Sequence, residues 1–140
     1  MSTDLDAIAL VKARQLRTMD TKDWDGMGRT FTSDVVLDFT AIGGAVTTGA
    51  DAVVAMVRSA LDGATSVHQV FQPEITVGAD GASAIWAMQD VVVWPDGTRT
   101  IGFGHYHETY TKIDGEWYIA TSRLSRLYSG ALPAKQGEPA

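Results

Sequence analysis

The chain has 140 residues, 45% of them hydrophobic, which predicts one domain whose core folds without help from disulfides or metal ions. Seventeen acidic residues outnumber eleven basic ones, and the formal net charge of -6 disfavours nucleic acid and anionic membranes as partners. The lack of cysteine excludes thiolate chemistry. No apolar run reaches the roughly 20 residues of a membrane span, and no secretory signal opens the chain, so a cytoplasmic protein is expected.

Two helices are predicted near the amino terminus. Hydrophobic residues recur at helical spacing from Asp4 to Met19, and Thr3 followed by Asp6 has the pattern of a capping box. A short second helix is predicted from Trp24 to Arg29, with Asp23 as its N-cap.

A third helix is predicted after Thr48, which we expect to be its N-cap. Asp51 would lie at the positive end of the helix dipole, and the apolar stripe ends at Gly63. One strand, from Val35 to Phe39, is predicted before this helix.

After Gly63 the hydrophobic period changes from 3.6 residues to 2, which is typical of strands. Short connections rich in Gly, Asp and Pro join these segments, so successive strands are expected to pair antiparallel. Gly102 and Gly104 predict bends or bulges. The predicted strands are Val67–Val77, Ser83–Trp94, Arg99–Ile113 and Glu116–Leu127.

This order of elements predicts an α+β fold, in which three helices cover one face of a long, strongly curved, mostly antiparallel sheet. Such a sheet makes a cone with a cavity inside it. We expect a single domain over residues 1–128 and a flexible tail over residues 129–140, where Pro133, Gly137 and Pro139 lie among small and polar residues.

Asp20 and His68 are the first candidates for catalytic chemistry, because the cone would place the end of the first helix above the start of a strand. If they meet, Asp20 fixes the tautomer of the imidazole and leaves the other nitrogen free to take a proton from a substrate. In the alternative interpretation, Asp20 caps the following turn and His68 is a hydrogen-bonded core residue.

Asp90 is the second candidate, since it shares one face of its strand with the large apolar residues Trp86 and Met88. Burial among them would favour the uncharged carboxyl group and make a second acid-base group. The alternative is an ion pair with Arg123 or Arg126 on a neighbouring strand.

His105 and His107 point to one face of their strand and Tyr106 to the other. With His68 they would supply three imidazoles to a metal ion, but the glutamate that the cupin pattern places after its second histidine is missing. We therefore expect no metal and no cofactor, and a solvent-facing or interface role for these two histidines. The face of Tyr106, which it shares with small residues, suits a ligand cavity.

Six short segments have an informative order and spacing. They are Asp20–Asp25, Phe31–Val35, Gly49–Ala52, Ser66–Val70, Gly104–Tyr110 and Asp114–Trp117. Together they resemble the SnoaL-like branch of the nuclear transport factor two-like superfamily, over residues 5–127. The resemblance implies a cone of three helices on a curved antiparallel sheet, a hydrophobic pocket, and a dimer formed through the sheet.

The branch that this resemblance points to holds scytalone dehydratase, bile acid dehydratase, hexachlorocyclohexane dehydrochlorinase, steroid isomerases and polyketide cyclases, many of which use no cofactor. Asp20 and His68 fall where the dehydratases and the dehydrochlorinase carry an Asp-His dyad. The resemblance therefore favours the functional interpretation of this pair.

Further positions follow from the same resemblance. Asp90 matches the approximate place of another pocket acid or histidine, Tyr106 matches a pocket-lining aromatic residue, and Arg126 roughly matches an arginine of the last strand. Gln15 is a departure, because the dehydratases have a catalytic tyrosine five residues before the dyad aspartate.

We expect a cofactor-independent lyase in which His68, oriented by Asp20, removes a proton while a leaving group departs. An isomerase or cyclase with Asp90 as proton carrier is one alternative. The other is a non-catalytic binding module, in which Asp20 and His68 do not meet and side chains fill the cavity.

The expected partners are a small hydrophobic, aromatic or polycyclic substrate and further copies of this chain. The residues predicted to bind the substrate are Gln15, Leu37, Phe39, Trp86, Met88, Asp90, Tyr106 and Arg126.

Overall fold

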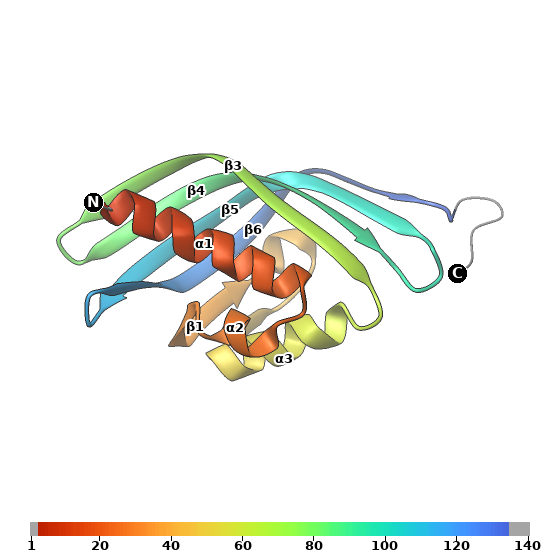
Figure 1. The fold of residues 1–140 in the computed structure, drawn as a ribbon. Coiled ribbons are helices and arrows are strands. Elements are labelled where there is room, and N and C mark those ends of the chain that lie inside the picture. Colours follow the sequence, from red (N-terminus) through yellow and green to blue (C-terminus); the bar gives the residue numbers. More distant parts are fainter. Residues whose placement is uncertain (1–2, 135–140) are drawn as a thin grey trace.

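The computed structural model describes residues 3–134 and confirms the predicted α+β fold. Three helices pack on a curled, unclosed sheet of six strands (Figure 1). The helices are α1 (Asp4–Asp20), α2 (Trp24–Gly28) and α3 (Ala50–Ala60), with a 3-10 turn, η1 (Thr40–Ile42). The strands are β1 (Phe31–Asp38), β2 (Val46–Thr48), β3 (Thr65–Gly78), β4 (Gly81–Val93), β5 (Arg99–Ile113) and β6 (Glu116–Leu132).

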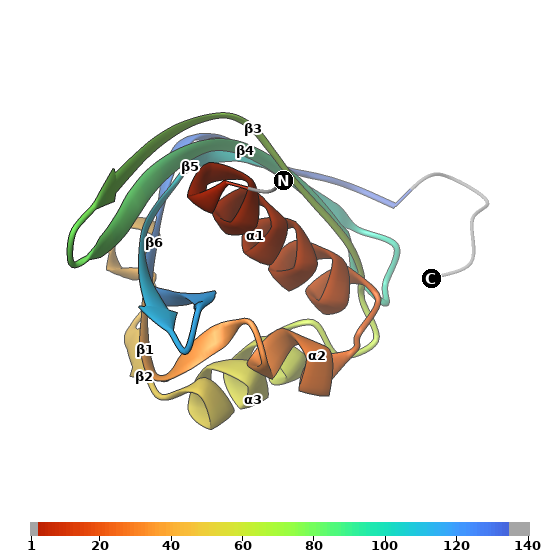
Figure 2. The same cartoon turned by 60° about the vertical axis from the view of Figure 1, so that its left-hand side comes forward.

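The sheet has the strand order β2-β1-β6-β5-β4-β3. Neighbouring strands pair antiparallel except β1 and β6, which are parallel. Figure 2 shows the long strands curving over α1, while α2 and α3 lie beneath the opening of the curve. The buried core therefore lies between the inner face of the sheet and the helices.

The N-caps of the first two helices agree with the prediction. Thr3 Oγ1 accepts the backbone N–H of Asp6 at 3.2 Å, and the Asp6 carboxylate accepts the backbone N–H of Thr3 at 3.3 Å, which completes a capping box. Asp23 Oδ1 accepts the backbone N–H of Gly26 at 3.0 Å and caps α2. The short α2 is thereby fixed directly after the end of α1.

The prediction that Thr48 caps the third helix was wrong. Thr48 belongs to β2, a three-residue strand that the sequence pattern did not predict, and the N-cap of α3 is Gly49. Gly49 has φ 98°, a conformation that residues with a Cβ rarely adopt, so the sharp turn from strand to helix requires glycine there.

The predicted irregularity in β5 is present at Gly104. The register between β5 and β6 shifts between Phe103 and Gly104, and Leu127 of β6 is the extra residue of the bulge. β6 continues to Leu132, which pairs with Arg99, so it passes the boundary predicted at residue 128. The rest of the predicted tail, residues 135–140, lies outside the described residues.

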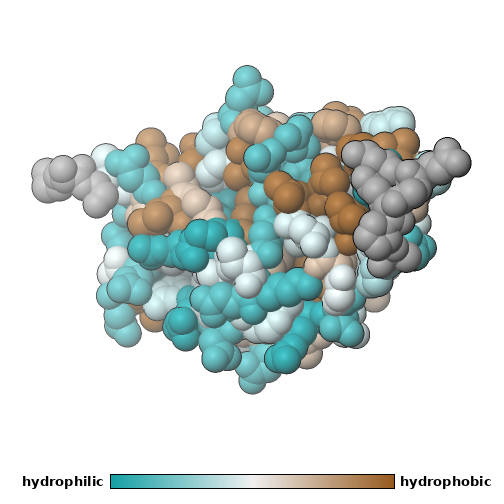
Figure 3. Space-filling model, turned by 45° about the vertical axis from the view of Figure 1, so that its right-hand side comes forward, coloured by the Kyte–Doolittle hydropathy of each residue, from teal (hydrophilic) through white to brown (hydrophobic). Residues whose placement is uncertain are grey.

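The outer face of the sheet carries exposed apolar side chains on four neighbouring strands. In the view of Figure 3, hydrophobic residues are concentrated on the sheet side of the molecule and hydrophilic residues on the opposite side. We call this set the outer apolar face; its members are Val67, Phe71, Ile85, Val93, Phe103, Leu127 and Tyr128. No helix within residues 3–134 is long and apolar enough to span a membrane.

Candidate active site

The last residue of α1, Asp20, lies against the edge strand β3 and contacts His68 twice. Asp20 Oδ1 is 2.7 Å from His68 Nδ1, and Asp20 Oδ2 accepts the backbone N–H of His68 at 2.7 Å. Ser66 Oγ donates a third hydrogen bond, of 2.8 Å, to Asp20 Oδ1. Because an ionised carboxylate only accepts hydrogen bonds, this contact requires a proton on Nδ1 of His68, and in the neutral imidazole Nε2 then has the lone pair.

Asp90 lies directly opposite His68 in the register of β3 and β4. Its Oδ2 atom is 3.9 Å from His68 Nε2, too far for a hydrogen bond, and 2.9 Å from Arg126 Nη2. Of the two interpretations of Asp90, the structure therefore has the ion pair, and the partner is Arg126. The negative charge of Asp90 lies where it would stabilise a proton taken up by Nε2.

Gly102 makes the contact between Asp90 and Arg126 possible. It pairs with Asp90 across β4 and β5, and a Cβ at this position would overlap the Arg126 guanidinium and lie 2.7 Å from Asp90 Oδ1. The guanidinium thus occupies the space that a side chain at residue 102 would take.

A cavity of about 300 Å³ opens between the inner face of the sheet, α1 and α3. Its walls are mostly apolar, and the residues that the sequence did not single out include Met19, Met27, Met56, Trp94 and Leu124. His68 also lines the cavity, while Asp20 lies behind it. The predicted substrate-binding residues found in the lining are Gln15, Leu37, Phe39, Asp90, Tyr106 and Arg126.

Trp86 and Met88 were predicted to form part of the cavity wall, and this was wrong. Both are buried and face inward, but neither is in the cavity lining. The indole N–H of Trp86 donates to the hydroxyl of Tyr110 at 2.9 Å, which directs the ring into the core. Met88 is covered by Arg126, whose Nη1 lies 3.5 Å from its sulfur.

Two charged residues of the cavity wall, Lys12 and Glu108, were missed in the sequence. Lys12 Nζ is 2.9 Å from Glu108 Oε2, and each side chain is 1% exposed. Glu108 also accepts the hydroxyl groups of Ser122 at 2.6 Å and Tyr110 at 2.7 Å. Burial lowers the pKa of Lys12, while the charge of Glu108 acts in the opposite direction.

A sequence signal for this pair does exist. Lys12 continues the inward stripe of α1 between Ile8 and Gln15, and Glu108 follows Tyr106 by two residues on the inner face of β5. A cation on a buried helix stripe and an anion on a buried strand face compensate each other only if the two elements meet.

The three histidines do not come together. His105 and His107 lie on the outer face of β5, as predicted, with ring centres 6.2 Å apart, whereas His68 faces the cavity. His107 Nε2 is 3.0 Å from Ser125 Oγ, and partial burial, with Arg123 and His105 nearby, lowers the pKa of His107.

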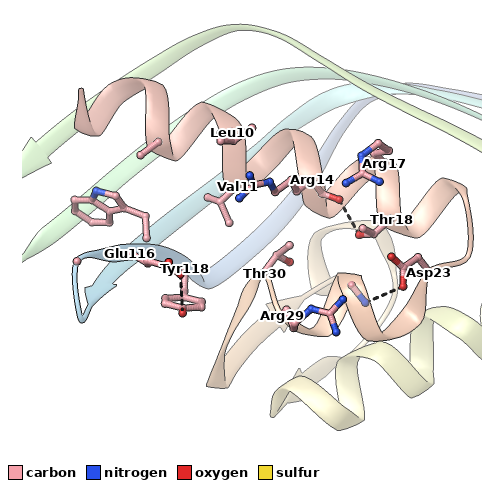
Figure 4. Close-up of a pocket in the computed structure, with 14 residues that line it drawn as sticks. Leu10, Val11, Arg14, Arg17, Thr18, Asp23, Arg29, Thr30, Glu116 and Tyr118 are labelled. Atoms are coloured by element: carbon pink, nitrogen blue, oxygen red, sulfur yellow. Dashed lines mark hydrogen bonds between the residues drawn. The ribbon is translucent and has the colours of Figure 1, made fainter. Parts of the chain in front are cut away.

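A second cleft, of about 500 Å³, lies on the other side of α1, next to α2 and the turn between β5 and β6 (Figure 4). Its charged lining consists of Arg14, Arg17, Arg29, Asp23 and Glu116. None of the predicted site residues belongs to its described lining, and neither does any histidine of residues 3–134. The interior cavity is therefore the candidate active site.

The chain thus forms an α+β cone, and the contact between Asp20 and His68 lies at one wall of its apolar cavity. Residues 1–123 match the family model of the SnoaL-like domain, so the chain belongs to the SnoaL-like family. The resemblance seen in the six sequence segments is thereby confirmed.

Similar proteins agree with this assignment. A protein of Gibberella zeae named "Probable cyclase FGR4" is 26% identical over 148 residues, which cover 91% of this chain and 96% of that protein. The Kfla4162 protein from Kribbella flavida superposes with a TM-score of 0.84 at 20% identity, over 91% of this chain and 93% of the other. Hexachlorocyclohexane dehydrochlorinase LinA-type3 from Novosphingobium barchaimii has a TM-score of 0.79 at 17% identity, over 99% and 98% of the two chains. The two structures share the fold of this protein.

Proposed function

We propose that this protein is a cofactor-independent lyase, which eliminates water, halide or a carbonyl fragment from a small hydrophobic substrate. The observation that carries this proposal is the position of His68: Asp20 Oδ1 lies 2.7 Å from Nδ1, and the side chain lines an apolar cavity. That arrangement is the one required of a general base. The dehydrochlorinase among the similar structures is an eliminating enzyme by its name.

The proposed reaction uses His68 first as a base and then as an acid. Nε2 removes a proton from the substrate, and Asp20 stabilises the imidazolium that results. The electron pair of the broken bond expels the leaving group, which takes the proton from Nε2 as it departs. Asp90, 3.9 Å from Nε2, adds a second negative charge beside the imidazolium.

The cavity supports an aromatic or polycyclic substrate. Its volume of about 300 Å³ is at the lower end of the usual range for small-molecule pockets, and most of its lining is aliphatic, aromatic or thioether. Such walls bind flat hydrophobic rings and exclude water, which strengthens the electrostatic interactions of the few polar groups.

An isomerase or cyclase is the second candidate, favoured by the similarity to the cyclase named above. In such an enzyme the proton removed from one atom returns to another atom of the same molecule. Asp90 is the proton carrier that the sequence suggests for this reaction. Its carboxylate is already paired with Arg126 at 2.9 Å, whereas His68 lines the cavity with Nε2 3.9 Å from Asp90, beyond hydrogen-bond distance, so His68 is the better candidate for the base in both reactions.

A non-catalytic binding module is less well supported. It would leave Asp20 and His68 apart and the cavity filled, whereas the two side chains are 2.7 Å apart and the cavity has a volume of about 300 Å³.

The test uses mass spectrometry to identify the products formed from a panel of aromatic and polycyclic substrates that carry a hydroxyl or halide leaving group. A product that has lost water or hydrogen halide identifies a lyase, and a new product with the mass of the substrate identifies an isomerase or cyclase. We expect His68→Gln to reduce turnover by about 10² to 10⁴-fold, the usual contribution of a general base, with little change in thermal stability. His105→Gln, on the outer face, is the matched control. An active His68→Gln variant would refute the assignment.

We further propose that two copies of the chain associate through the outer apolar face. This surface is continuous across β3 to β6, and its exposed aromatic residues include Phe103 at 41% and Tyr128 at 64%. Contiguous apolar surface of this kind is typical of protein interfaces.

A further inference from the structure

We propose that the second cleft, on the other side of α1 from the interior cavity, binds a small organic anion: a carboxylate joined to an aromatic or aliphatic group. The cleft has a volume of about 500 Å³ and lies between α1, α2 and the start of β6 (Figure 4). It shares no lining residue with the interior cavity, so this inference goes beyond the proposed function and does not depend on it.

One face of α1 forms a wall of the cleft, and its character changes along the helix. Six lining residues follow one another at the spacing of a single helix face: Ala7, Leu10, Val11, Arg14, Arg17 and Thr18. The first three are apolar, and Leu10 is 48% exposed although its side chain is large. The next two are arginines. The wall therefore has an apolar half followed by a basic half, which suits a ligand with the same division.

A second element contributes a third arginine. Arg29 directly follows α2 and lies on the other side of the cleft from Arg14 and Arg17 of α1 (Figure 4). Three guanidinium groups thus line one cleft of a chain whose formal net charge is -6. Because like charges repel, this arrangement is unfavourable by itself, and a bound anion would offset the repulsion.

The protein itself does not neutralise these three arginines. Arg14, Arg17 and Arg29 are exposed, and within residues 3–134 none of them forms an ion pair. By contrast, Lys12 and Arg126 each have a carboxylate partner at 2.9 Å. A guanidinium group presents parallel N–H donors that match the two oxygens of a carboxylate. The arginines of the cleft are therefore available to a carboxylate from outside the protein.

The two acidic residues of the lining indicate how much negative charge the ligand carries. Asp23 accepts the backbone N–H of Gly26 at 3.0 Å, and Glu116 accepts the hydroxyl of Tyr118 at 3.3 Å. Figure 4 shows these two acids at opposite ends of the cleft, with the labelled arginines between them. Their charges, together with the net charge of the chain, disfavour a dianion such as a phosphate monoester more than a monoanion. A carboxylate is the favoured anionic group for this reason.

The test uses 2-naphthoate as the probe and follows the arginine Nε–H signals by NMR, each assigned by its absence from the corresponding Arg→Gln variant. We expect saturable shifts of the signals of Arg14, Arg17 and Arg29. The uncharged 2-naphthamide, and acetate, which lacks the rings, should each bind about tenfold more weakly or less. High salt should weaken the binding of 2-naphthoate, because the arginines are exposed to solvent. Equal binding of 2-naphthamide, or shifts confined to Arg126 of the interior cavity, would overturn the proposal.

The basic half is tested by removing one guanidinium group from each side of the cleft. Arg14→Gln and Arg29→Gln should each weaken 2-naphthoate binding by about threefold or more and leave 2-naphthamide binding unchanged. Arg58→Gln, at an exposed residue of α3 outside the cleft, changes the net charge by the same amount and is the matched control. An equal loss in Arg58→Gln would show that the probe responds only to net charge, and the assignment of the cleft would be wrong.

The apolar half is tested with Leu10→Ser. This variant should weaken 2-naphthoate binding by about threefold or more and leave acetate binding unchanged. Leu5→Ser is the control, since Leu5 is 50% exposed on the same helix but is not in the lining. If Leu10→Ser binds 2-naphthoate as tightly as the intact protein does, the ligand does not contact the apolar half of α1.

The outcome is separable from that of the proposed function. His68→Gln should bind 2-naphthoate as the intact protein does, whatever its effect on turnover, because His68 lies in the other cavity. Loss of the shifts at Arg14 and Arg29 in His68→Gln would overturn the proposal, since the probe would then be bound through the interior cavity. A cleft that binds no anion would leave the Asp20–His68 base untouched.

Discussion

Individual side chains of the cavity differ in whether their polar atoms already have partners. The charges of Asp90 and Lys12 are each bonded to an opposite charge, at 2.9 Å in both cases. The hydroxyl of Tyr106 and the amino group of Gln15 have no partner among the described residues, and Nε2 of His68 has only Asp90 at 3.9 Å. The groups that remain available for a ligand are therefore one imidazole nitrogen, one hydroxyl and one amide amino group.

The burial of Tyr106 predicts a dependence of stability on alkaline pH. Because the folded state raises the pKa of this phenol, the unfolded chain loses the proton first. The stabilisation is complete below the unfolded pKa of about 10 and is lost as pH rises above it, by about 1.4 kcal/mol per pH unit. We expect Tyr106→Phe to reduce the fall in unfolding free energy that urea titrations show above about pH 10. Tyr128→Phe is the control, and equal slopes for the intact protein and Tyr106→Phe would contradict the prediction.

The sequence could predict some of these residues and not others. The positions of Asp20 and His68 alone left open whether Asp20 caps a turn and His68 is a core residue, and the resemblance to the family favoured the pair. Lys12 and Glu108 are 96 residues apart, and although each lies on an inward-facing position, nothing in the spacing shows that the two meet. Their compensation becomes visible only when α1 lies on β5. The choice between Arg123 and Arg126 as partner of Asp90 depended on which of them faces inward, which periodicity alone left open.

At the level of elements, the contact between β4, β5 and β6 depends on a missing side chain. Gly102 leaves space for the guanidinium of Arg126, which crosses from β6 to reach Asp90 on β4. The bulge at Leu127 lies beside Arg126 and ends the regular register of β5 and β6 there. The position of the Arg126 guanidinium therefore depends on β6, on the bulge at Leu127 and on the space left by Gly102.

We expect Gly102→Ala to break the Asp90–Arg126 pair, because the new methyl group would lie 2.7 Å from Asp90 Oδ1 and overlap the guanidinium. Leaving a buried carboxylate without its partner should lower the free energy of unfolding by about 1–3 kcal/mol in urea titrations. The control is Gly28→Ala, whose methyl group would meet Val54 at an ordinary 3.6 Å. Equal stability of the two variants would show that Arg126 has another way to reach Asp90.

The elements with a long periodic pattern were predicted best. The strands β3 to β6 and the helices α1 and α3 were recognised because each repeats its pattern over several residues, and the short α2 was recognised by its Asp23 cap. The strand predicted from Val35 to Phe39 is β1, which begins four residues earlier, at Phe31. β2 has three residues, too few to show a period, and Thr48 belongs to this strand and does not cap α3. The limits of β6 were also misjudged, since pairing with β5 extends it to Leu132.

At the scale of the whole molecule, the outer apolar face predicts self-association. Phe103 is 41% exposed near the centre of that face, and its ring lies 6.3 Å from that of Tyr128. A lysine in its place would have to be desolvated between two copies, so Phe103→Lys should give a monomer by light scattering where the intact protein gives a dimer. Leu10→Lys, at a residue 48% exposed on α1, is the control. A monomeric intact protein would contradict the proposed dimer.

The curvature of the sheet was predictable from the length of its strands and from the three helices that it covers. The side chains that line the cavity were not predictable in this way. Whether an inward side chain meets the cavity or the core depends on what packs above it. Trp86 and Tyr106 are cross-strand partners on the same inner face, yet only Tyr106 reaches the cavity.

The hydrogen bond from the backbone N–H of His68 to Asp20 has a consequence for assembly. β3 is an edge strand, and an edge strand with free N–H groups is a template onto which another chain can add. The Asp20 carboxylate accepts one of these N–H groups, so the end of helix α1 covers the edge of the sheet at that point. Asp20→Asn retains an oxygen that can accept this N–H, whereas Asp20→Ala exposes it. One aspartate thus both contacts the imidazole that lines the cavity and covers a backbone N–H group at the edge of the sheet.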